Sequence, residues 1–180
     1  MENFSMHSSS ACAATSYMPL ISALFRDLDQ AEQAYRSASE CGYGFHDINV
    51  VMSEATRRRY YSGHPRICQP GAPGGSKNAE NTTLGAIEYA LAAVGAPLVL
   101  AKFRLVVAGN YSALSAGGDG THGSLADTLF RWRIPVQHIK DYERGIRAGG
   151  IIISIRPRNG EDAAHITHSW QAYHGECVLA

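Results

Sequence analysis

The sequence has no apolar run long enough to cross a membrane. Its longest apolar window covers residues 89–101 and ends at Lys102 and Arg104, whereas a membrane-spanning helix needs about 20 such residues. Glu88 places a further charge beside the same window. We therefore expect no stable membrane insertion.

Cysteines are few and scattered. The four of them form no C-x-x-C pair, and a chain of 180 residues can build a core without disulfides. The sequence therefore predicts reduced thiols at Cys12, Cys41, Cys68 and Cys177 and a cytoplasmic location. Residues 1–16 are rich in Ser and Ala and contain no Lys or Arg, so we expect a flexible N-terminal tail rather than a signal peptide.

Neither sign of charge is in excess. Sixteen Lys and Arg residues balance sixteen Asp and Glu residues, so a general electrostatic attraction to nucleic acid is not expected. The hydrophobic share of 45% against a charged share of 18% predicts a folded chain. We expect residues 17–180 to form a single α+β domain, in which residues 62–148 are a loop followed by a helical insertion.

The usual catalytic motifs are also missing. No Ser lies in a G-x-S-x-G turn, and no lysine follows a glycine loop as in a Walker motif. Cys41 and Cys177 fall in a predicted helix stripe and a predicted strand, where thiols usually behave as small hydrophobes. The sequence therefore predicts a protein that is not an enzyme and holds no cofactor.

Both ends of the chain carry a strand–helix–strand pattern. The first predicted helix follows Asp27, and its apolar residues recur at three- and four-residue steps. The last predicted helix follows Asn159 and ends at Gly175. The predicted strands cover residues 19–25, 47–53, 151–156 and 176–180. Two such units predict a ferredoxin-like split βαβ sandwich, with a four-stranded sheet and two helices on one face.

The long insertion is expected to be helical. Residues 84–116 are apolar and rich in Gly and Ala, a composition that lets helices approach closely. Ser124 is a suitable N-cap for a helix over residues 125–132, and Pro135 for the start of the next one. The predicted buried side of that next helix consists of Val136, Ile139, Tyr142 and Ile146.

An ordered set of segments is similar to a known family. These segments are residues 25–34, 42–61, 134–135, 142–156 and 161–163, with a Gly/Ala-rich stretch over 105–123 between them. Together they resemble the small bacterial general stress, or heat-induced stress, proteins, whose domain has no characterised function. The resemblance implies a stress-associated, non-enzymatic cytoplasmic protein, and it carries no catalytic residue over to this chain.

Three groups of residues are candidate sites. A G-x-G-x-x-G pattern contains Gly118, Asp119, Gly120 and His122. No strand is expected to end at its first glycine, as a cofactor-binding fingerprint requires, so a turn between helices is a simpler interpretation than a cofactor site. His165 and His168, three residues apart, have the spacing of two metal ligands, but they lie off the predicted buried stripe, so we expect exposure and no metal. Interaction with a partner is the third possibility, at Arg57, Arg58, Tyr60 and Tyr61, although we expect no nucleic-acid binding.

A sheet with helices on only one face leaves its other face open. An open apolar face generally marks a contact surface, so we expect it to be covered either by the helical insertion or by a second subunit, for which a two-fold homodimer is the simplest arrangement. The predicted function is therefore a non-catalytic one, exerted through contacts with an unknown protein partner and through self-association. The alternative is a small-molecule-binding protein or enzyme with a pocket between the sheet and the insertion.

Overall fold

The structure, a computed structural model, describes residues 18–61, 85–100, 103–111 and 124–179. Its centre is one sheet of six strands in the order β3-β4-β2-β5-β1-β6, in which every neighbouring pair is antiparallel. The strands are β1 (Ile21–Phe25), β2 (Ile48–Ser53), β3 (Ala96–Leu100), β4 (Phe103–Ala108), β5 (Ile151–Ile155) and β6 (Glu176–Leu179).

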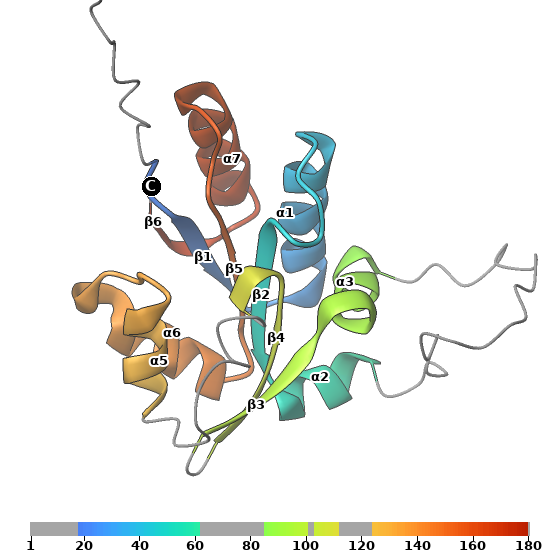
Figure 1. Cartoon of the computed structure of the whole chain (residues 1–180), viewed down its shortest axis with the longest axis vertical. Helices are drawn as coiled ribbons and strands as arrows, with labels where there is room; N and C mark the ends of the chain where they lie inside the picture. The colour runs from blue at the N-terminus through green and yellow to red at the C-terminus, as the bar shows by residue number, and fades with distance from the viewer. Residues whose placement is uncertain (1–17, 62–84, 101–102, 112–123, 180) are drawn as a thin grey trace, which may run out of the picture.

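The described residues form six helices, which cover the sheet on both sides (Figure 1). They are α1 (Leu28–Glu40), α2 (Glu54–Tyr61), α3 (Ala86–Val94), α5 (Leu125–Arg131), α6 (Val136–Arg147) and α7 (Gly160–Ala172). One apolar core lies between the sheet and α1, α3 and α7, and a second lies between the sheet and α5 and α6. Every residue of β1, β2 and β5 is buried, as expected of strands covered on both faces.

The predicted four-stranded ferredoxin-like sheet is wrong, because the insertion adds two strands to it. The four predicted terminal strands are present as β1, β2, β5 and β6, but β3 and β4 form a hairpin that extends the sheet beyond β2. The prediction of helices over residues 96–108 was wrong because it relied on the Gly and Ala content of the insertion. Gly95 and Pro97 end α3, and Val99, Val106 and Val107 favour strands.

The second face of the sheet is covered by the chain itself. α5 and α6 place Leu129, Ile139, Tyr142 and Ile146 on this face, each less than a tenth exposed. Gly145 allows α6 to approach β1 closely, since a Cβ at this position would lie 2.1 Å from Leu24 Cδ2. Of the two covers expected for this face, the structure therefore shows the insertion itself, and the case for a second subunit on this face has lost its structural basis.

Local signals in the other segments are largely confirmed. The Ser124 hydroxyl accepts from the Asp127 amide, and the Asn159 side chain accepts from the Asp162 amide, so both predicted N-caps form. Asp27 precedes α1 without capping it through its side chain. Along α6, Ile139, Tyr142 and Ile146 are buried as predicted, whereas Val136 is 65% exposed.

Candidate docking surface

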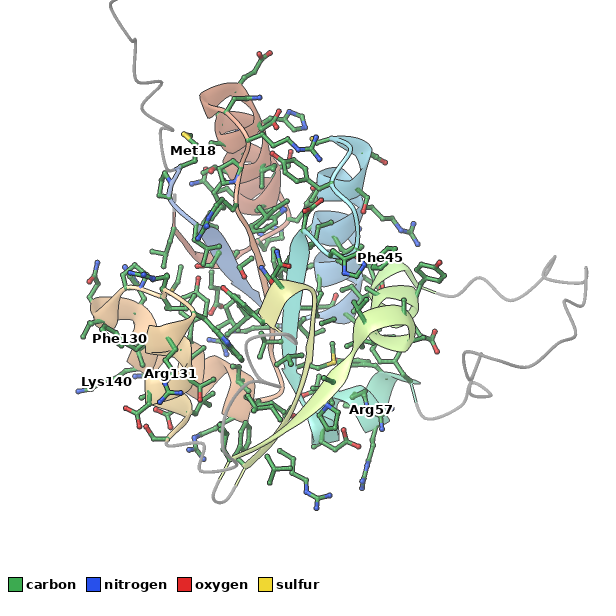
Figure 2. All side chains as sticks on the ribbon, in the orientation of Figure 1. Met18, Phe45, Arg57, Phe130, Arg131 and Lys140 are labelled. Atoms are coloured by element: carbon green, nitrogen blue, oxygen red, sulfur yellow. The ribbon has the colours of Figure 1, made fainter. Side chains whose placement is uncertain are left out.

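A group of apolar and cationic side chains is exposed where α5 passes into α6. Phe130 is 60% exposed and Val136 is 65% exposed, and these are two of the four large hydrophobic residues that the described ranges expose. Three exposed cations accompany them, at Arg131, Arg133 and Lys140. We call these five residues the α5–α6 surface; Figure 2 shows Phe130, Arg131 and Lys140 on the same side of the molecule.

The end of α5 fixes this arrangement. The Arg133 amide donates to the Phe130 carbonyl at 2.9 Å, and the Ile134 amide donates to the Leu129 carbonyl at 3.1 Å. These two bonds define a Schellman motif, in which the residue after the C-cap has a left-handed backbone. Arg133 fills that position with φ 67°. Since Leu129 and Ile134 point into the core, Phe130 is turned outward.

The direction of Val136 follows from helix geometry. At 100° per residue, Val136 points about 90° away from the mean direction of Ile139, Tyr142 and Ile146. Lys140 is one turn further along the helix on the side of Val136. The three buried side chains hold α6 on the sheet, so Val136 and Lys140 lie on a flank that nothing in the described part of the chain covers.

The cations of this surface form no close ion pair within the described ranges, although Arg131 lies one turn from Asp127 on α5 and helps to lower the pKa of that carboxyl. Elsewhere on α6, Arg144 pairs with Asp141 and Arg147 pairs with Glu143. Arg131, Arg133 and Lys140 form no ion pair of this kind. The surface therefore combines two large apolar side chains with three positive charges, none of which is in a close ion pair.

The residues predicted for interaction lie on α2, where their own neighbours occupy them. Arg57 and Arg58 both pair with Glu54, at 2.9 and 3.1 Å. Tyr61 is partly buried against the core, and burial raises the pKa of its hydroxyl. The Tyr60 ring lies beside Arg59 of the same helix, whose guanidinium carbon is 5.4 Å from the ring centroid.

The other candidate sites divide into exposed and undescribed ones. His165 and His168 are exposed on α7, as the sequence predicts, and they do not belong to the group of metal-ligating side chains that the described residues bring together. Gly118, Asp119, Gly120 and His122 lie outside the described residues. Within the described ranges, no helix has the length and apolarity of a membrane span.

The two described cysteines do not have the environment of an activated nucleophile. Burial is the largest cause raising the pKa of both the Cys41 and the Cys177 thiols, and neighbouring carboxylates act in the same direction. A reactive cysteine needs the opposite, a lowered pKa beside a cation or a helix N-terminus. These two thiols therefore give no support to covalent catalysis.

Sequence reasoning overlooked the α5–α6 surface because it placed Val136 in the core and gave Phe130 no role. An angular check of Val136 against the other three residues of its stripe would have signalled the exposure. Comparison with protein families, with curated proteins and with solved structures found no match to this chain.

Proposed function

We propose that this chain is a non-catalytic protein that binds an acidic segment of a partner protein through the α5–α6 surface. The observation that carries the proposal is the exposure of Phe130 and Val136 among three exposed cations that form no close ion pair. Protein interfaces typically have an apolar centre with aromatic and arginine residues enriched and a polar rim. Phe130 and Val136 supply the centre, and Arg131, Arg133 and Lys140 supply the rim.

The charges favour an acidic partner over a second copy on this face. A two-fold dimer places the same patch of each subunit against the other, so the three cations of one copy would meet those of its mate. Like charges brought together in an interface are unfavourable. An acidic segment with apolar side chains satisfies the surface without this repulsion.

The stress association and the cytoplasmic location belong to the same proposal. The first rests on the resemblance of the sequence to general stress proteins. The second is supported by Cys41 and Cys177, which are free thiols in the structure, since disulfides are rare in cytosolic proteins.

Site-specific photo-crosslinking in living cells tests this function. A benzophenone amino acid replaces Phe130 in one variant and Tyr89, on α3 and 58% exposed, in the matched control. We expect a crosslinked protein from position 130, joined through an acidic segment, and none of it from position 89. Arg131→Glu with Lys140→Glu should reduce the yield several-fold, while Arg104→Glu on β4 should not.

Two outcomes would reject the proposal. Equal crosslinking from positions 89 and 130 would mean that the α5–α6 surface is not a specific contact. Crosslinking from position 130 to a second copy of the chain would replace the acidic partner by self-association.

A homodimer through the edge strand β3 is the second candidate. β3 ends the sheet, pairs only with β4 in the described residues and exposes 56% of Val99. Such an edge accepts a strand from another chain. Light scattering at micromolar concentration should then give twice the chain mass of 19.4 kDa, and Val99→Lys should return it to the single-chain value. A wild-type mass of one chain would reject this dimer.

A further inference from the structure

Three side chains of different chemistry meet on the flank of α6 that faces β6. They are His138 and Asp141, from α6, and Cys177, from β6. Their nitrogen, oxygen and sulfur donor atoms all lie within 4.8 Å of one another, and each residue is partly buried. No sequence motif joins them, because the cysteine is far along the chain from the other two.

The helix supplies two of the three donors by its repeat. Residues three apart lie on the same side of an α-helix, so His138 and Asp141 project together. At 100° per residue this flank is roughly opposite to the one that carries Val136 and Lys140. The group is therefore separate from the α5–α6 surface, and its role does not depend on the proposed function.

A β-bulge supplies the third donor. β1 and β6 pair at Ser22 with Leu179 and at Leu24 with Glu176. Between these pairs β1 has one residue and β6 has two, so β6 carries one extra residue. Cys177 lies in the bulge with φ 53°, a left-handed backbone that is unfavourable for a residue other than glycine.

The bulge is held in place from α6 itself. The hydroxyl of Tyr142, a fully buried residue next to Asp141, donates to the Cys177 carbonyl at 2.9 Å. Because this uses its only hydrogen, the Ser22 hydroxyl is the donor in the second bond of Tyr142, also 2.9 Å long. One helix thus carries two of the donors and also fixes the backbone of the residue that carries the third.

We propose that His138, Asp141 and Cys177 bind a divalent transition-metal ion of the zinc class. A thiolate together with an imidazole suits zinc and cobalt, whereas magnesium and calcium prefer oxygen donors alone. In a tetrahedral zinc site, with bonds of about 2.0–2.3 Å, donor atoms lie about 3.3–3.8 Å apart. Side-chain adjustments of about 1 Å bring the present separations into this range.

The site has three protein ligands and leaves one position for water. Glu176, the nearest additional carboxylate along the chain, is held by Arg26 through two hydrogen bonds of 2.6 and 2.8 Å. The bound ion would connect α6 to the edge strand β6, which pairs with β1 alone in the described part of the sheet. We therefore expect the ion to stabilise the folded chain increasingly as its concentration rises.

Cobalt titration of the full-length, tag-free protein tests the site. Co²⁺ bound by a thiolate gives a ligand-to-metal charge-transfer band in the near ultraviolet, which reports directly on cysteine ligation. We expect one Co²⁺ per chain with this band, displacement by Zn²⁺, and loss of the band in Cys177→Ser. His138→Ala and Asp141→Asn should each weaken binding at least about 10-fold, since even removal of a group that only orients a ligand has an effect of this size.

Matched variants separate this site from other donors of the chain. Cys41→Ser removes a second partly buried free thiol, and His165→Ala with His168→Ala removes the histidine pair of α7; all should bind like the wild type. Circular dichroism verifies that Cys177→Ser is folded, and Asp141→Asn provides a second variant if it is not. Absence of the band, its persistence in Cys177→Ser, or its loss in Cys41→Ser, Cys12→Ser or Cys68→Ser would overturn the proposal.

Discussion

The contact between α6 and β1 can be tested by exchanging volume across it. Gly145 is buried, and a Cβ there would lie 2.1 Å from Leu24 Cδ2 and 2.8 Å from Leu24 Cδ1. Leu24 is itself only 1% exposed, so its side chain has little room to move aside. Gly145→Ala therefore forces a shift, and Leu24→Ala removes the atoms with which the new methyl group collides.

Opposing effects make the single variants hard to interpret alone. Gly→Ala in a helix interior stabilises by about 1 kcal/mol through propensity, while overpacking a core destabilises by about 1–3 kcal/mol. Leu24→Ala should destabilise by about 2–5 kcal/mol. In a double-mutant cycle the helix propensity cancels, because Gly→Ala contributes it in both backgrounds. The coupling free energy that remains should favour the double variant by about 1–3 kcal/mol.

Urea denaturation of the wild type, both single variants and the double variant measures this coupling. Gly160→Ala, in the first turn of α7, is the matched control, because a Cβ there meets nothing within 4 Å. It should change the free energy of unfolding by less than about 1 kcal/mol and should be additive with Leu24→Ala. If Gly145→Ala and Leu24→Ala are additive as well, α6 does not pack on the second face of the sheet through this contact.

The remaining predictions address single groups. Arg133→Gly should stabilise the fold by about 1 kcal/mol in urea denaturation, because glycine adopts the left-handed backbone without a steric penalty; an unchanged midpoint would contradict this. Glu32 accepts from the Ala86 and Ile87 amides at the start of α3, so Glu32→Ala should destabilise by about 1–2 kcal/mol, as loss of an N-cap does, and should speed hydrogen exchange in α3 more than in α7. Burial raises the pKa of Tyr35 and Tyr111 to about 12. The contribution of these two hydroxyls to stability is therefore complete below pH 10 and is lost as the pH rises through 12. Part of the tyrosinate absorbance should accordingly appear only when the far-ultraviolet dichroism is lost.

Local patterns in the sequence predicted the terminal elements well. Apolar residues recur at three- and four-residue steps in α1 and α7, and Ser124 and Asn159 cap nearby amides. Both signals extend over only a few residues, so they are visible without tertiary information. The hairpin of β3 and β4 was missed because small residues in the same region also fit helices. The β-branched residues Val99, Val106 and Val107 were the competing signal, and pairing with β2 decided the outcome.

Whether the insertion or a second subunit covers the second face could not be decided in the same way. Helix α6 shows a clear apolar stripe, but a stripe does not say which surface it will meet. The decision depends on the contact between Gly145 and Leu24 and on the hydrogen bond that Ser22 donates to Tyr142, which join residues more than 100 positions apart. For the same reason the group formed by His138, Asp141 and Cys177 has no sequence signature, since a bulge in strand pairing brings it together.

The ends of the helices show where this chain accepts strain. α1 and α6 end in Schellman motifs with Gly42 and Gly149 in the left-handed position, at φ 81° and 97°. α5 and α7 end in the same motif with Arg133 and His174 instead, at φ 67° and 59°, although glycine would be favoured at either position by about 1 kcal/mol. Strain of this kind is concentrated at functional sites, and Arg133 supplies one of the three cations of the α5–α6 surface. Arg133→Gly should therefore raise stability and lower the crosslinking yield from position 130 together, whereas a purely structural role for Arg133 would leave that yield unchanged.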